Sequence, residues 1–138
     1  MISRIKPTLH GSQLRGATLS LEEKAALAQR YGYPGLDFAL AEARAYPGGP
    51  AAVRDLLASH GLEASTVGGV FGARLTDASD AEFDQALQSV AENARQAASF
   101  GGERTGTGLP PRADRPKDEL WPLAVERIRR LDEALDGT

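Results

Sequence analysis

The chain has 138 residues, 41% of them hydrophobic and 25% charged, a composition typical of one soluble globular domain. It contains no cysteine, which excludes disulfides, thiolate catalysis and cysteine-bound metal sites. The formal net charge of -3 arises from acidic and basic residues mixed along the chain, so no basic face for nucleic acid is expected. Neither a membrane-spanning apolar run nor a secretion signal is present in the sequence, which predicts a cytoplasmic protein without a membrane partner.

The first predicted unit is a short strand over residues 5–9 followed by a helix. Ser20 and Glu23 form a capping box, in which each side chain satisfies a backbone N–H of the first helical turn. The helix is expected to end at Gly32, because glycine readily takes the left-handed conformation that follows many helices.

The second and third units repeat this arrangement. A strand is predicted over residues 36–40, and Pro50 then begins a helix, because its missing N–H would have had no partner in the first turn. A third strand over residues 65–71 is followed by the longest helix, which a second capping box of Ser79 and Glu82 begins.

The fourth unit combines a strand over residues 104–109, dominated by threonine and glycine, with a helix after a proline-rich stretch. Glycines within a strand usually mark a close backbone approach or a bend. The helix carries an apolar stripe that predicts its buried face, formed by Trp121, Val125, Ile128, Leu131 and Leu135.

Strands that alternate with helices about every 30 residues predict one α/β domain over residues 1–138, with a parallel sheet and right-handed crossovers. Two architectures share this rhythm. Four βα units make half of a (β/α)8 TIM barrel, whereas an open doubly wound, flavodoxin-like sheet is complete at this length. No phosphate-binding G-x-G-x-x-G or Walker loop follows a predicted strand, and periodicity alone leaves both architectures open.

Three helix-to-strand boundaries carry a resemblance to a known family. They read GYPGLDF at residues 32–38, HGLEASTV at residues 60–67 and AASFGG at residues 97–102. In this order and spacing they resemble the sugar phosphate isomerase/epimerase superfamily, the xylose isomerase-like TIM barrels, with Phe100 where leucine is usual. The resemblance covers nearly the whole chain and corresponds to the N-terminal half of such a barrel.

The resemblance implies a divalent-metal enzyme that moves a proton between adjacent carbons of a sugar or sugar phosphate. Such enzymes hold the metal through Glu, Asp and His side chains of strands five to eight, and a fifth strand would follow Thr138. No metal ligand is therefore expected in this chain, no catalytic residue is assigned, and the isolated chain is expected to be inactive. The related abasic-site nucleases have a histidine-rich metal site that is not visible in this sequence.

Substrate-binding candidates lie just after or within the predicted strands, because TIM barrels place their sites at the carboxyl ends of the strands. His10 can bond a hydroxyl or carbonyl, or act as an acid. Asp37 corresponds to an acidic residue that faces the barrel interior in the family, Thr107 offers a hydroxyl, and Arg112 suits a phosphate or carboxylate. Each has a plainer reading: a polar strand end for His10, backbone hydrogen bonds for Asp37, strand packing near Thr107 and a solvated surface for Arg112.

A half-barrel would leave two sheet edges unpaired and its inner face uncovered. The chain is therefore predicted to work as part of a metal-dependent sugar isomerase or epimerase when the other half is supplied. The alternative is a non-catalytic half-barrel that self-associates as a homodimer and binds a small anionic or sugar ligand.

Overall fold

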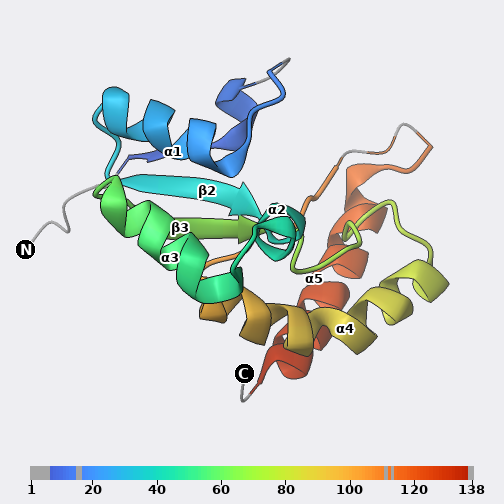
Figure 1. Cartoon of the computed structure of the whole chain (residues 1–138). Helices are drawn as coiled ribbons and strands as arrows, with labels where there is room; N and C mark the ends of the chain where they lie inside the picture. Colours follow the sequence, from blue (N-terminus) through green and yellow to red (C-terminus); the bar gives the residue numbers. More distant parts are fainter. Residues whose placement is uncertain (1–6, 15–16, 111, 113, 137–138) are drawn as a thin grey trace, which may run out of the picture.

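The structure is a computed structural model that describes residues 7–14, 17–110, 112 and 114–136. Within these residues three parallel strands form one sheet in the order β1-β2-β3 (Figure 1). The strands are β1 (Thr8–Leu9), β2 (Gly35–Ala39) and β3 (Glu63–Gly68). The helices are a 3-10 turn η1 (Gly11–Leu14), α1 (Leu21–Arg30), α2 (Leu40–Ala45), α3 (Gly49–Ser59), α4 (Asp80–Ser99) and α5 (Lys117–Leu135).

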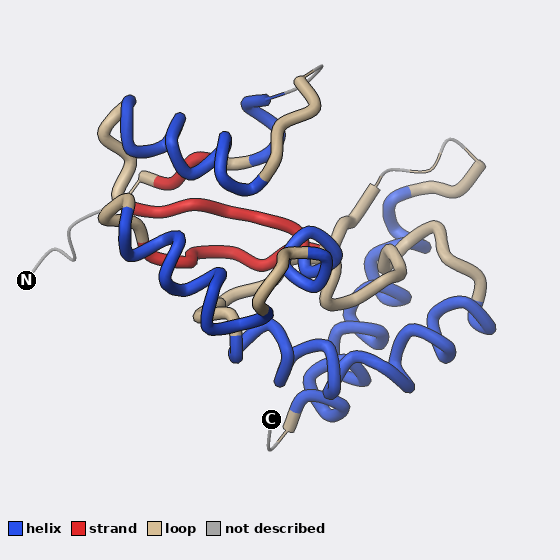
Figure 2. The backbone as a smooth tube through the Cα atoms, in the orientation of Figure 1, coloured by secondary structure: helices blue, strands red, loops and turns tan. Residues whose placement is uncertain are grey.

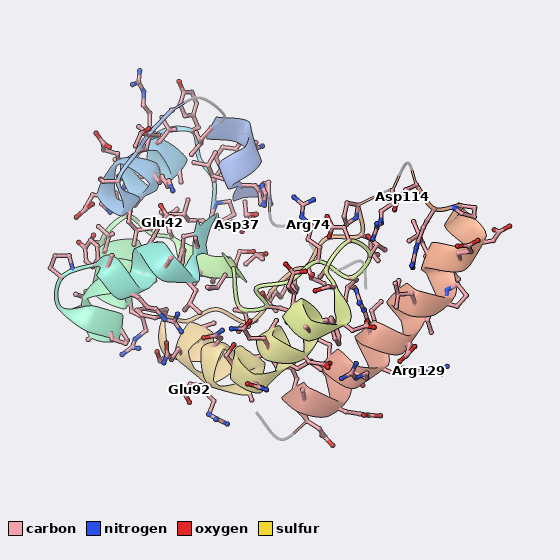
Figure 3. All side chains as sticks on the ribbon, turned by 90° about the vertical axis from the view of Figure 1, so that its right-hand side faces the viewer. Asp37, Glu42, Arg74, Glu92, Asp114 and Arg129 are labelled. Atoms are coloured by element: carbon pink, nitrogen blue, oxygen red, sulfur yellow. The ribbon has the colours of Figure 1, made fainter. Side chains whose placement is uncertain are left out.

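The helices wrap one side of the sheet (Figure 2), and the parallel strands all point toward the same set of loops (Figure 1). Seen from that end, the chain forms a crescent with α1 at one tip and α5 at the other (Figure 3). The predicted βα alternation is therefore confirmed, and the mixed α/β structure with parallel strands matches half of a TIM barrel. None of the helices described is long and apolar enough to cross a membrane.

Both capping boxes form as predicted. The Ser20 hydroxyl accepts the Glu23 N–H at 3.2 Å, and the Glu23 carboxylate accepts the Ser20 N–H at 2.8 Å. Ser79 and Glu82 make the same pair of bonds at the start of α4. The bond from the Ser79 N–H lowers the pKa of the Glu82 carboxyl below its ordinary value.

The core lies between the sheet and the helices. Leu36 and Val67 are fully buried on the helix-facing side of β2 and β3, and Phe83 of α4 is fully buried in the same core cluster. Phe83 meets Phe71 edge to face, with ring centroids 5.4 Å apart. Each such buried side chain contributes about 1.5–3 kcal/mol, so this layer is the main source of stability.

The expected strand over residues 104–109 is reduced to one isolated bridge. Arg104 pairs with Thr66 in parallel, and the Val67 N–H donates to the Arg104 carbonyl at 2.9 Å. The ladder stops there because β3 ends at Gly68 and the chain turns at Gly69, which has φ of 78°. The expected strand over residues 5–9 is seen only at β1, and residues 5 and 6 lie outside the described part.

Close backbone approach occurs before this segment and not within it. A Cβ added to Gly102 would lie 2.3 Å from the Val67 Cγ2 atom, so only glycine lets the end of α4 pack on β3. A Cβ added to Gly106 would meet nothing within 4 Å, and one added to Gly108 would make only ordinary contacts. The sequence left two interpretations of these glycines open, room for a substrate and packing against a neighbouring strand, and Gly106 and Gly108 do not show the packing.

The buried face of α5 differs from the predicted stripe. Leu120, Ala124 and Arg127 face the core, whereas Trp121 is 61% exposed and Ile128 is 45% exposed. These faces are about 100° apart, one residue along the helix. The prediction of a buried Trp121 was wrong because an apolar stripe does not show whether an arginine on the adjacent face will be buried instead.

A short helix, α2, was not predicted. It begins at Leu40, the last residue of the expected second strand, and the Glu42 carboxylate accepts the Ala39 N–H at 3.0 Å. Glu42 also pairs with Lys24 of α1. Glu42 therefore stabilises the first turn of α2 and the contact between α1 and α2.

Candidate functional site

The inner face of the sheet, opposite the helices, carries small and polar side chains. A Cβ added to Gly35 would lie 2.9 Å from the Thr8 Cγ2 atom and 3.7 Å from the Ser65 Cβ atom. Thr8, Gly35 and Ser65 therefore share this face. Strand alternation places Asp37 on the same side as Gly35, and Asp37 lies toward the concave side of the crescent (Figure 3).

Asp37 is 9% exposed and binds the backbone of the neighbouring strand. Its carboxylate accepts the Thr66 N–H at 3.1 Å, at the point where the pairing of β2 with β3 shifts register between Leu36 and Phe38. A register shift leaves a backbone donor without a strand partner, and Asp37 supplies the acceptor. This is the plainer reading of Asp37 from the sequence, and it leaves carboxylate acceptor sites for a second donor.

His10 stands at the end of β1, beside Asp37 in register. Leu9 pairs with Leu36 in the parallel sheet, so the next residues of the two strands, His10 and Asp37, are neighbours. His10 is exposed, and its backbone N–H donates to the Gln13 side chain at 2.8 Å in η1. The structure thus brings together two of the four residues proposed from the sequence.

Thr107 makes a contact that the sequence did not indicate. Its hydroxyl donates to the Ala73 carbonyl at 3.1 Å in the loop between β3 and α4. In the same region the Leu75 N–H donates to the Gly108 carbonyl at 3.0 Å. The hydroxyl of Thr76, which is buried, donates to the Pro110 carbonyl at 2.6 Å. Two loops at the carboxyl ends of the strands are therefore tied together.

Arg127 of α5 binds the loop between β3 and α4 from the core side, and no sequence motif predicted this contact. The guanidinium donates to the carbonyls of Leu75 at 3.1 Å and Ala78 at 2.9 Å, and to the Asp80 carboxylate at 2.7 Å. It also lies over the Phe83 ring, 4.9 Å from the centroid. Only the regular spacing of Leu120, Ala124 and Arg127 could have indicated that this arginine faces the core.

Arg112 lines a pocket at the start of α5, and neither His10 nor Asp37 belongs to that pocket. Its guanidinium binds the Asp114 carboxylate twice, at 2.8 and 2.5 Å, and these bonds hold the pKa of Asp114 below its ordinary range. The pocket has a volume of about 340 Å³. The lining is mostly apolar and includes three cationic side chains, those of Arg112, Arg115 and Lys117. The other lining residues are Thr76, Leu109, Pro110, Leu120, Trp121 and Ala124.

Two further arginines, Arg44 of α2 and Arg74 of the loop between β3 and α4, have different surroundings. Arg44 donates to Asn93 at 2.6 Å and to Gln96 at 2.7 Å, so it joins α2 to α4 within the helix layer. Arg74 pairs with Asp77 at 3.3 Å and lies toward the opening of the crescent (Figure 3). It also lines a polar cleft of about 510 Å³ between this loop and α4.

The described residues do not provide a divalent-metal site. They contain no group of three or more His, Asp or Glu side chains placed to hold a metal ion. The carboxylates of Asp37 and Glu42 are already hydrogen-bonded within the fold. Asp37 accepts the Thr66 N–H, and Glu42 binds Lys24 and accepts the Ala39 N–H. A metal that the family resemblance implies does not fit this donor set, so no chemical step at these residues is assigned to it.

Comparison with solved structures gives consistent matches to barrels of one type. A xylose isomerase domain protein from Alicyclobacillus acidocaldarius subsp. acidocaldarius matches over 95% of this chain and 46% of its own, with 28% identity and a TM-score of 0.70. The chain has the fold of half a xylose isomerase-like TIM barrel. No family model and no curated protein sequence matches this half-barrel.

Two further structures show the same fold at lower identity. The probable 3-DHS dehydratase AsbF, involved in petrobactin synthesis in Bacillus anthracis, matches over 95% of this chain and 48% of its own, with 18% identity and a TM-score of 0.70. D-Psicose 3-epimerase from Clostridium cellulolyticum H10, solved with D-tagatose, matches over 96% and 49%, with 11% identity and a TM-score of 0.70. The half-barrel thus spans about half the length of the structures it matches.

Proposed function

We propose that this half-barrel supplies the substrate-contacting N-terminal half of a sugar isomerase or epimerase site, and that a second half-barrel completes it. The main support is the match of 96% of the chain to 49% of D-psicose 3-epimerase, together with similar matches to two related barrels. In barrels of this kind the site lies at the carboxyl ends of the strands. Here His10 follows the carboxyl end of β1, and Asp37 lies in the middle of β2 on the same face of the sheet.

The inner face suits a hydroxyl-rich ligand. Thr8, Gly35 and Ser65 place only small groups on this face, and hydroxyl and carboxylate groups can exchange hydrogen bonds with sugar hydroxyls. In this proposal Asp37 accepts a bond from a substrate hydroxyl, and His10 donates to a hydroxyl or carbonyl oxygen. The divalent metal and the acid and base that move the proton belong to the second half-barrel.

Thr107 acts in the proposal as a positioning residue. Its hydroxyl is engaged with the Ala73 carbonyl, so it fixes the loop between β3 and α4 and does not bind substrate directly. Arg112 remains a candidate for an anionic group on the substrate, such as a phosphate. To bind such a group, Arg112 would have to release the Asp114 carboxylate, to which it donates two hydrogen bonds.

The experiment uses the two histidines of the chain, His10 and His60. His10 follows β1, whereas His60 ends α3 at the opposite end of the sheet, with Nδ1 3.0 Å from the Leu56 carbonyl oxygen. D-Tagatose or D-fructose is titrated into the protein while the ring C–H signals of both histidines are followed by NMR. The His10 signals should move and saturate, and those of His60 should stay in place.

Two variants identify the signals and test the site. His60→Gln removes one set of signals and should leave the titration of the other unchanged. Asp37→Asn keeps an acceptor for the Thr66 N–H but removes the charge, and it should weaken the ketose-induced shift several-fold. If both histidines move equally, or neither moves at high ketose concentration, the proposal is wrong.

The second candidate is a non-catalytic half-barrel that binds a small anion. The specific observation in its favour is the 340 Å³ pocket with Arg112, Arg115 and Lys117 at its edge. In that case inorganic phosphate should move the indole N–H signal of Trp121, the single tryptophan, while ketoses leave His10 unaffected.

A further inference from the structure

One tip of the crescent carries an apolar surface that no described residue covers. Leu109 is 50% exposed, Trp121 is 61% exposed and Ile128 is 45% exposed. We call these three residues the α5 surface. Leu109 and Trp121 also line the 340 Å³ pocket, whose edge carries Arg112, Arg115 and Lys117. Large apolar side chains that gather on one exposed face usually mark a contact with another molecule.

The other tip of the crescent is formed by β1 and α1. β1 is an edge strand, since it pairs only with β2 among the described strands. Glu22 and Glu23 stand in the first turn of α1 and are exposed. Both α1 and α5 begin on the side toward which the strands point (Figure 1), and they lie at opposite tips of the crescent (Figure 3).

We propose that the α5 surface of one chain packs against the β1 and α1 tip of a second copy, and that this contact occurs twice around a two-fold axis. The arrangement deepens the proposed function, because it names a second copy as the half-barrel that completes the ring. Two rotated copies bring β1 of each chain beside the Arg104 segment of the other.

The charge at the start of α5 is mixed, because its first turn also carries Asp118 and Glu119. The helix starts lie at the same end of the sheet, so Arg115 and Lys117 are the groups there that can pair with the acidic first turn of α1 of the other copy. Arg115 and Lys117 would face Glu22 and Glu23 of the second copy. Opposite charges at the edge of an apolar contact set its orientation and register.

The sheet edges favour this arrangement, because β1 of one copy and the Arg104 segment of the other each lack a further partner among the described strands. A direct α5-to-α5 contact would also bury Trp121 and Ile128. It would leave the sheet edges at β1 and Arg104 unpaired in both copies, which is the less stable outcome.

The first test is the molar mass of the 138-residue chain by light scattering after size exclusion. We expect twice the mass of one chain, together with a blue-shifted Trp121 emission that returns to a water-exposed spectrum on dilution. Trp121→Asp and Ile128→Asp should each give a monomer with an unchanged circular dichroism spectrum. The control, Gln88→Asp, adds the same charge at an exposed position of α4 and should stay dimeric. A wild-type monomer at high concentration overturns the proposal.

The second test determines the arrangement, and it is straightforward because the chain contains no cysteine. A mixture of the single variants Glu22→Cys and Lys117→Cys should form mixed disulfide dimers under mild oxidation, well above the level of either variant alone. Efficient cross-linking of Ile128→Cys with itself indicates α5-to-α5 pairing and overturns the proposal. Ketose titration of His10 in the monomeric variants is a separate readout, so failure of the interface and failure of the sugar site can be told apart.

Discussion

From within the core, the guanidinium of Arg127 binds two carbonyls of one loop and the carboxylate of Asp80 at the start of α4. Its side chain is 3% exposed, whereas its ionic partner Asp80 is 89% exposed. The charge is thus neutralised at the surface while the remaining donors satisfy the carbonyls of Leu75 and Ala78. A buried arginine with this many partners fixes the loop that borders the candidate site, because losing it leaves buried acceptors without donors.

We expect Arg127→Met to lower the free energy of unfolding by about 2–4 kcal/mol, because two carbonyl groups lose their donor and the Asp80 contact disappears. Arg129→Met is the matched control. Arg129 is exposed on the outer side of α5 (Figure 3), so its removal should change stability by less than about 0.5 kcal/mol. Urea unfolding of the two variants measures the difference, and equal midpoints would show that the Arg127 contacts do not stabilise the fold.

At the scale of elements, the end of α4 packs on β3 at Gly102, a residue without a side chain. Gly101, with φ of 92°, ends the helix, and Gly102 then passes so close to Val67 that a methyl group would overlap it. This approach delivers Arg104 to its bridge with Thr66. The start of the fourth βα unit therefore depends on Gly102 more than on the glycines that follow.

Gly102→Ala should destabilise the protein by about 1–3 kcal/mol, since β3 or the end of α4 must move to admit the added methyl group. Gly106→Ala, four residues along, has open space and should be neutral or slightly stabilising, within about 0.5 kcal/mol. Thermal unfolding of both variants provides the comparison. Equal losses at the two positions would mean that backbone freedom, and not packing, explains the glycines.

At the scale of the whole molecule, the sequence predicted the features that local chemistry determines. Capping boxes and helix-ending glycines indicated α1, α3 and α4, and the βα rhythm with three boundary segments indicated half a barrel. It did not predict the loss of a strand after Arg104, because that depends on where β3 ends. The burial of Arg127 in place of Trp121 depends on contacts between elements that are distant in sequence.

The same limit applies to the candidate site. The position of His10 after a strand could be predicted from the sequence, because parallel strands bring their carboxyl ends to one edge. Asp37 lies in the middle of β2, and its choice rested on the family resemblance and on strand alternation. The engagement of Thr107 with Ala73, and of Arg112 with Asp114, could not be predicted, since the loops involved have no periodic pattern. The hydrogen-bond partners of side chains on loops depend on which residues lie nearby in space, and a local sequence pattern does not show these residues.

A half-barrel that pairs with a copy of itself should have a stability that depends on its own concentration. Folded dimer and unfolded monomers are linked by mass action, so each tenfold rise in chain concentration should raise the unfolding temperature by about 2–5 °C. A half-barrel that folds alone has no such dependence. Calorimetry of the wild-type chain over two decades of concentration distinguishes these cases, with Trp121→Asp as the control that should unfold at one temperature throughout. A constant unfolding temperature for both proteins would mean that the sheet edges and the α5 surface are stable in water without a second copy.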